Sequence, residues 1–181
     1  MAFPRVAENT YGLVARAAHQ VLGKSEPALV RDLDSEISWA KTSNVSAARY
    51  PEVAAGRSVA GASAAQVSAT MALYEKQKLT EGSVDFNDIL MCNAVLLTEH
   101  PEIGETIRQT YRHFVVDEYQ DVSALQHRLI SLWVDGRRDV CVVGDPNQAI
   151  HSFAGADASY LLGFAAGVAG APKTGEAGAW S

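Results

Sequence analysis

The fold class is decided by residues 113–126, HFVVDEYQDVSALQ, where a short apolar run ends in three acids: Asp117, Glu118 and Asp121. A brief apolar run that stops at a polar turn is typical of a buried strand. The next residues begin a segment with helical spacing of apolar side chains, and Ser123 is a suitable N-cap for it. This stretch therefore predicts a strand, an acidic turn and a helix.

A second apolar run, Val140 to Val143, follows that helix and stops at the turn Gly144–Gln148, GDPNQ. A strand–helix–strand order is typical of a parallel sheet, and nearly continuous apolar strands indicate a sheet covered on both faces. The carboxyl ends of parallel strands meet at one edge, where such sheets place their functional sites. We therefore expect one rim to hold Asp117, Glu118, Asp145 and Gln148.

Clustered carboxylates repel one another unless a cation or a proton compensates their charge. Mg²⁺ is the natural cation, because it takes hard oxygen ligands and keeps waters for phosphate. One acid could hold the metal, its neighbour could polarise an attacking water, and Gln148 could sense the phosphate. The alternative is that the acids are solvated turn residues or charges at the start of a helix.

The first 80 or so residues have helical patterns at about 6–22, 29–40 and 64–79, separated by a loop rich in Gly, Ser and Ala. The third pattern predicts one face with Val67, Met71, Tyr74 and Leu79. Further helices are expected at about 86–99 and 102–112, the first ending before Pro101. The early part is thus predicted to be helical and the later part α/β.

Composition excludes some classes of protein. Of the 181 residues, 48% are hydrophobic and 20% are charged, which is ordinary for a globular protein. The formal net charge of −6 argues against a chain-wide nucleic-acid footprint, although a local groove could still be basic. Cys92 and Cys141 lack metal-ligand spacing and are predicted to be buried thiols in a reducing compartment. No apolar run approaches a bilayer span and the start lacks signal-peptide order, so a cytoplasmic location is expected.

The segments VVDEYQD and VCVVGDPNQAIHSFAGAD resemble motifs II and III of the UvrD/Rep/PcrA-type superfamily 1 DNA helicases, with the actinobacterial UvrD-like branch the most similar. Upstream, VDFNDIL resembles the family's DF(D/N)DLL segment, and the resemblance covers roughly Leu29 to Phe164. It implies an α/β fold in which residues 80–165 form part of a RecA-like P-loop NTPase domain. Residues 1–79 would be an all-helical subdomain of the 1B type, and residues 166–181 are expected to be a disordered tail.

The same resemblance implies roles for individual residues, with ATP and Mg²⁺ as cofactors and single-stranded or 3′-tailed duplex DNA as partner. Asp117 would bind Mg²⁺, Glu118 would be the general base, and Gln148 would contact the γ-phosphate. Asp145 falls at the nucleotide side of motif III, where a structural role in the turn is favoured over direct ligation. The side chains implied to line the DNA track are Phe86, His151 and Phe153; core packing is the alternative for the two phenylalanines.

No glycine-rich Gly-Lys-Ser/Thr loop follows a strand in this sequence, and Gly23–Ser25 is predicted to be a helix end rather than a phosphate loop. The family's second RecA-like domain and arginine finger have no counterpart either. The chain is therefore expected to be a fragment of an ATP-dependent 3′–5′ DNA helicase, inactive without the missing segments or a partner chain. Two alternatives stay open: a non-enzymatic remnant that binds single-stranded DNA or a protein, and an unrelated Mg²⁺-dependent phosphohydrolase.

Overall fold

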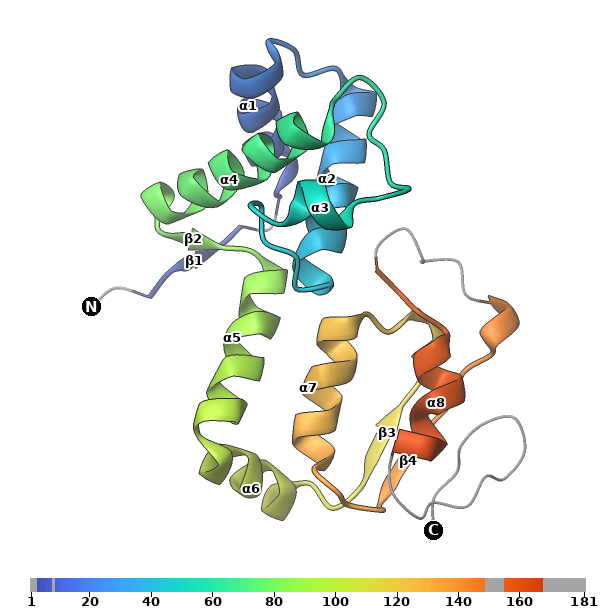
Figure 1. Ribbon diagram of the computed structural model, residues 1–181. Coiled ribbons are helices and arrows are strands. Elements are labelled where there is room, and N and C mark those ends of the chain that lie inside the picture. The colour runs from blue at the N-terminus through green and yellow to red at the C-terminus, as the bar shows by residue number, and fades with distance from the viewer. Residues whose placement is uncertain (1–2, 8, 149–154, 168–181) are drawn as a thin grey trace. The chain divides into compact units, whose positions relative to one another are not determined.

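The computed structural model describes residues 3–7, 9–148 and 155–167 (Figure 1). The chain forms two compact units, Met1–Ile89 and Leu90–Ser181, and the division between them falls within helix α5, Phe86–Glu99. His151, Phe153 and the predicted tail beyond Gly167 lie outside the described residues. Residues 166 and 167, assigned to that tail, belong instead to helix α8, Ser159–Gly167.

Unit 1 is built mainly from α1 (Tyr11–Leu22), α2 (Pro27–Thr42), α3 (Tyr50–Val53) and α4 (Ala64–Glu81). Local signals fix the helix ends. Gly23 ends α1 with a φ of 70°, a left-handed conformation that glycine adopts without steric cost, and Pro27 occupies the first turn of α2. The buried side chains of these helices form one core, which includes Val14, Val30, Leu33, Ile37, Tyr50, Val67, Met71 and Tyr74.

The prediction of an all-helical first part is wrong in one respect. Strand β1 (Arg5–Val6) pairs in parallel with β2 (Ser83–Val84), and the backbone N–H of Ala7 donates to Val84 O at 2.8 Å. A two-residue strand is too short to produce an alternating pattern, so its pairing with a segment nearly 80 residues away has no signal in the local sequence.

One helical face was also assigned wrongly. Leu79 is 81% exposed, whereas Lys78 is only 2% exposed and continues the buried stripe of Val67, Met71 and Tyr74. The helical period places position 78, not 79, one turn beyond Tyr74 on the same face. The sequence pattern favoured the hydrophobic Leu79 for the buried position. Lys78 occupies it instead, because acids from another segment neutralise its charge.

Unit 2 contains the remaining part of α5, then α6 (Pro101–Thr110) and the predicted strand–helix–strand unit. The parts of that unit are β3 (Phe114–Val116), a 3₁₀ turn η1 (Tyr119–Asp121), α7 (Ala124–Val134) and β4 (Val140–Val142). A second 3₁₀ turn, η2 (Pro146–Gln148), follows β4. The strands are parallel, with Val115 opposite Cys141, which confirms the predicted unit.

Only one face of the β3–β4 sheet is covered in the described structure. Residues Phe114, Val116, Val140 and Val142 pack with side chains of α7 and α8 into the unit 2 core. On the other face Val115 is 73% exposed, so the described residues do not cover the sheet on both faces as expected. The prediction of two buried thiols also fails, because Cys92 is exposed and Cys141 is only partly buried.

Candidate functional site

Asp117 and Glu118 leave the carboxyl end of β3 on an exposed turn. Glu118 has a φ of 53°, one of the few positive φ values among the described non-glycine residues. The Asp117 Oδ1 atom accepts the Glu118 backbone N–H at 2.9 Å, which supports this turn from within. A left-handed conformation is uncommon for a residue other than glycine and costs conformational energy, so the backbone at Glu118 is held in a specific turn.

The second turn, at the carboxyl end of β4, is organised by Asp145. Its Oδ1 accepts the backbone N–H of Asn147 at 2.9 Å, and its Oδ2 accepts Gln148 Nε2 at the same distance. The Asn147 N–H and then the Gln148 amide hold the pKa of the Asp145 carboxyl below its ordinary value. Asp145 therefore fixes the position of Gln148, as a structural carboxylate in this turn would.

Backbone hydrogen bonds at Val143, the residue before the second turn, hold the two strand ends together. The Tyr119 N–H donates to Val143 O at 2.9 Å, and the Val143 N–H donates to Val116 O at 2.9 Å. Between the turns lies the side chain of Gln120, which is only 1% exposed. Its Nε2 donates to Glu118 Oε2 at 2.5 Å, and its Oε1 accepts the Asp145 N–H at 3.0 Å.

Gly144 is required for this close approach. A Cβ atom added there would lie 2.3 Å from Gln120 Oε1 and 3.1 Å from the Tyr119 nitrogen, so any larger residue would push the turns apart. Glycine in this position lets one backbone approach another closely. The GDPNQ turn is thus packed directly against the acidic turn.

An aromatic cluster packs the acidic turn against helices α7 and α8. Tyr119 is completely buried, and burial raises its pKa above the ordinary value of tyrosine. Its hydroxyl is hydrogen-bonded to His127 Nδ1 of α7 at 2.8 Å, and its ring meets Phe164 of α8 edge-on, with centroids 5.0 Å apart. The His127 ring stacks on Tyr160, with centroids 4.4 Å apart. The turn that presents Glu118 is therefore anchored to α7 and α8.

The acidic turn suits a hard divalent cation. Asp117 is exposed, and no described residue forms a hydrogen bond with its Oδ2. Deeper in the same turn, Asp121 Oδ1 is buried with no hydrogen-bond partner among the described residues. Exposed carboxylate oxygens at a strand end match the ligand preference of Mg²⁺, which keeps several waters in its shell. The donor set at Asp117 therefore fits Mg²⁺.

Comparison with known proteins identifies the family. The family model described as the UvrD/REP helicase N-terminal domain matches residues 8–168. The chain belongs to this family. It is 40% identical over 164 residues to the ATP-dependent DNA helicase UvrD2 of Mycobacterium tuberculosis, covering 88% of this chain and 23% of that protein. It is also 36% identical over 98 residues to the ATP-dependent DNA helicase PcrA of Bacillus subtilis, covering 54% of this chain and 13% of PcrA.

The chain thus spans about a quarter of the length of the UvrD2 helicases that it matches. The mixed architecture, mostly helical with small parallel sheets, is consistent with a UvrD/REP helicase N-terminal domain. Within the described part of the chain, no helix combines the length and apolar content needed to cross a bilayer.

Some of the predicted site residues of this UvrD/REP domain are linked by hydrogen bonds. Glu118, Asp145 and Gln148 are connected through Gln120, and Asp117 is adjacent to Glu118. Phe86, in unit 1, is 64% exposed, which argues against core packing there. Gln120 was missed, although its place inside the DEYQD motif was a signal that could have drawn attention to it.

Unit 1 of the helicase domain has a second acidic cluster: Glu75, Asp85 and Asp88 have oxygens within 4.8 Å of one another. Two lysines occupy the space that a metal would need. Lys41 Nζ lies 2.6 Å and Lys78 Nζ 2.7 Å from Asp85 Oδ2. Burial alone would raise the pKa of Asp85, but hydrogen bonds from both lysines outweigh it and hold that pKa well below its ordinary value. The cluster is an internal ion-pair network and not a metal site.

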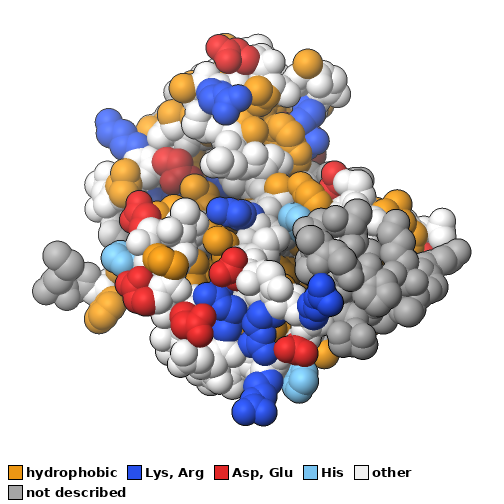
Figure 2. Space-filling view, turned by 60° about the horizontal axis from the view of Figure 1, so that its bottom comes forward, with side chains coloured by type: hydrophobic (Ala, Val, Ile, Leu, Met, Phe, Trp, Pro, Cys, Tyr) orange, Lys and Arg blue, Asp and Glu red, His pale blue; other side chains and the backbone are white. Residues whose placement is uncertain are grey.

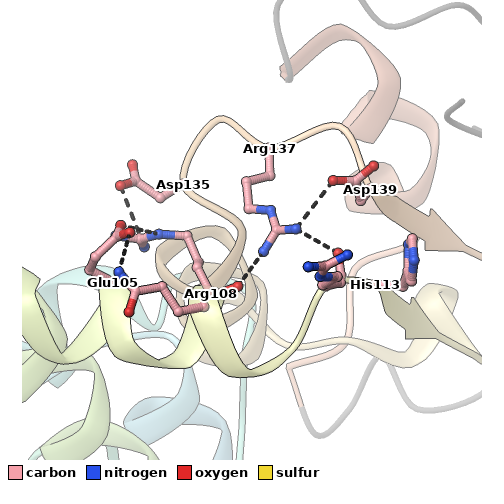
Figure 3. A pocket seen from close by; sticks show the side chains of 8 residues that line it. Glu105, Arg108, His113, Asp135, Arg137 and Asp139 are labelled. Atoms are coloured by element: carbon pink, nitrogen blue, oxygen red, sulfur yellow. Dashed lines mark hydrogen bonds and ion pairs between the residues drawn. The ribbon is translucent and has the colours of Figure 1, made fainter.

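Unit 2 has an open hollow of about 810 Å³ around the amino ends of the strands, away from the acidic turn (Figure 3). Its central arginine, Arg137, donates to the backbone carbonyls of Arg108 at 2.7 Å and Arg112 at 2.6 Å, and to Asp139 Oδ2 at 3.2 Å. Positive and negative side chains are interspersed on the face shown in Figure 2. Arg137 therefore links the end of α6 and the residues after it to the segment just before β4.

Proposed function

We propose that this chain forms part of the motor of an ATP-dependent 3′–5′ DNA helicase. The observation that supports this most strongly is the pair Asp117 and Glu118, exposed at the carboxyl end of β3 and held against the GDPNQ turn of β4. In this proposal residues 80–165 are the part of the RecA-like domain that bears motifs II and III. Residues 1–79 are the helical 1B-type subdomain.

In the proposed mechanism Glu118 is the general base that orients and deprotonates the attacking water. Asp117 would hold Mg²⁺, and the ion would neutralise charge on the phosphates of ATP. Gln148, oriented by Asp145, contacts the γ-phosphate and senses its loss. Asp145 acts through the turn, because its two carboxylate oxygens accept hydrogen bonds from Asn147 and Gln148.

Single-stranded DNA is the proposed nucleic-acid substrate, with a 3′-tailed duplex as the substrate for unwinding. Phe86 has the exposure that base stacking requires. Stacking on aromatic rings does not depend on base identity, which suits a motor that moves along any sequence. His151 and Phe153 are assigned to the same track by family position alone.

The 181-residue chain is proposed to be inactive in ATP hydrolysis on its own. Its Gly-Lys-Ser segment starts at Gly23, whose backbone N–H closes α1 by donating to His19 O at 3.0 Å. This segment therefore ends a helix. A phosphate-binding loop would instead link a strand to a helix. The second candidate function is a non-enzymatic module that binds single-stranded DNA or a protein, and the exposed ring of Phe86 is the observation that supports it.

The test uses a chimeric helicase in which residues 8–168 replace the matching segment of the mycobacterial UvrD2. Asp117→Asn is compared with Asp139→Asn, which changes an aspartate at the opposite, amino end of the same two-stranded sheet. We expect D117N to lower DNA-stimulated ATPase and duplex unwinding by about 100-fold and to raise the Mg²⁺ concentration needed. D139N should stay within a few-fold of the parent. Equal effects of the two changes would contradict the proposed role of Asp117.

A further inference from the structure

We infer that Gln120 is a positioning residue for hydrolysis, which fixes the carboxylate of Glu118 against the backbone of the GDPNQ turn. This inference rests on the proposed role of Glu118 as general base. Gln120 touches neither nucleotide nor metal in the proposed mechanism. It acts through the two residues that its amide joins, Glu118 and Asp145.

The chemistry of the two contacts requires an amide. Glu118 presents a carboxylate oxygen, which can only accept, and Asp145 presents a backbone N–H, which can only donate. The side chain between them must therefore donate at one atom and accept at another, which glutamine does with Nε2 and Oε1. Glutamate could still accept from Asp145, but it could not donate to Glu118 without taking up a proton. A methionine of similar length could make neither bond.

Burial makes these contacts strong determinants of position. The Gln120 side chain is 1% exposed, so water does not compete for its amide. Glycine at position 144 leaves room for the amide, because a Cβ there would lie 2.3 Å from Gln120 Oε1. The carboxylate of Glu118 is otherwise exposed at the end of a flexible side chain, and Gln120 restricts where it can point.

The bonds also form a continuous path from the base to the phosphate sensor. Glu118 Oε2 accepts from Gln120, Gln120 Oε1 accepts from the Asp145 N–H, and Asp145 Oδ2 accepts from Gln148 Nε2. When Gln148 gains or loses its contact with the γ-phosphate, the GDPNQ turn shifts. The hydrogen bonds of Gln120 transmit that shift to Glu118. Gln120 makes the orientation of the base depend on the turn that leads into the proposed DNA track.

The first experiment measures the link itself in the 181-residue chain, by amide hydrogen exchange at Asp145. The parent should protect this amide, and Gln120→Met should accelerate its exchange about 5- to 10-fold, the factor expected for one lost hydrogen bond. Gln120→Glu should leave the amide protected. The control is Gln109→Glu, since exposed Gln109 also donates to a glutamate, Glu105, at 3.1 Å. Rapid exchange in the parent, or no response to Q120M, would overturn the inference.

The second experiment measures ATP turnover in the chimeric helicase with single-stranded DNA. Q120E should lower kcat by about 10- to 100-fold, because Glu118 loses its hydrogen bond and meets a second carboxylate. KM for ATP should change less than about threefold, because the proposed nucleotide-binding groups are unchanged. The ratio of DNA-stimulated to basal rate should fall, and Q109E should match the parent. Unchanged kcat in Q120E, or a loss that merely follows a lower melting temperature, would overturn the positioning role. Full activity of Glu118→Gln would instead show that the proposed base is wrong.

Discussion

Asp85 is the centre of the buried ion-pair network in unit 1. It is 4% exposed, and Oδ2 accepts hydrogen bonds from Lys41, Lys78 and the Tyr74 hydroxyl at 2.6 to 2.7 Å. Breaking a buried pair from one side leaves uncompensated charge, so Asp85→Ala should lower the free energy of unfolding by about 3–5 kcal/mol. Urea denaturation of the 181-residue chain, followed by circular dichroism, checks this value.

The control for Asp85→Ala is Glu81→Gln. Glu81 pairs with Arg16 at 2.5 Å, but both side chains are about half exposed. Surface pairs of this kind contribute about 1 kcal/mol or less. A loss in D85A no larger than that in E81Q would show that the buried network does not stabilise unit 1.

Acid should destabilise the same network. Asp85 and Asp88 both have folded-state pKa values below the ordinary value, because hydrogen bonds from Lys41 and Lys78 outweigh the opposing effect of burial. Their contribution is therefore fully present above the unfolded pKa of about 4 and is lost as the pH falls toward the lower folded values. Thermal melting between pH 6 and pH 2.5 should show this decline, with a shallower slope in Asp85→Asn. Identical slopes would contradict the assignment.

The positions of individual residues could be predicted from the sequence where a motif fixes them. They could not be predicted where a partner distant in the sequence fixes them. The DEYQD and GDPNQ turns were predicted to share a sheet edge, and the Asp145 N–H of the second turn donates to the Gln120 side chain of the first. Lys78 was missed because acids that only the folded chain brings close surround it. Gln120 lies inside the DEYQD motif, but its bond to Asp145, 25 residues away, is visible only in the fold. Hydrophobic patterning does not mark a lysine as buried. Residue periodicity likewise does not mark a glutamine whose amide bridges two turns.

Helix α7 begins at a capping box that was partly predictable. Ser123 accepts the Gln126 N–H at 3.4 Å, and Gln126 Oε1 accepts the Ser123 N–H at 2.9 Å. Ser123→Ala should lower the free energy of unfolding by about 1 kcal/mol. Thr106→Ala on α6, an exposed residue whose hydroxyl donates to the Glu102 carbonyl of its own helix, is the control and should cost less. Chemical denaturation measures both, and equal losses would argue against the cap.

The strands show the limit of prediction from apolar patterns. The sequence correctly predicted two parallel strands around α7, because their apolar runs and the helical spacing between them are strong local signals. It could not show that Val115 would be 73% exposed, since the covering of a sheet face depends on segments elsewhere. The same limit applies to β1 and β2, which are too short to have a pattern.

For the whole molecule, Phe86 should affect DNA binding more than stability. In the chimeric helicase Phe86→Ala should weaken affinity for single-stranded DNA by about 5- to 100-fold, the loss expected for one stacked base. Tyr111→Ala, which removes another exposed ring, should leave the affinity near that of the parent. Fluorescence anisotropy with a labelled oligonucleotide measures both. Unchanged affinity in F86A together with a large fall in melting temperature would favour a packing role.

The most direct test of the central claim is ATP turnover by Glu118→Gln in the chimeric helicase, with nucleotide binding measured in parallel. The amide keeps the shape of the side chain but cannot accept a proton from water, so hydrolysis should fall by about 100-fold or more while ATP affinity stays within a few-fold. Glu102→Gln, an exposed change on α6, should behave like the parent. Turnover by E118Q within a few-fold of the parent would contradict the claim that Glu118 is the base.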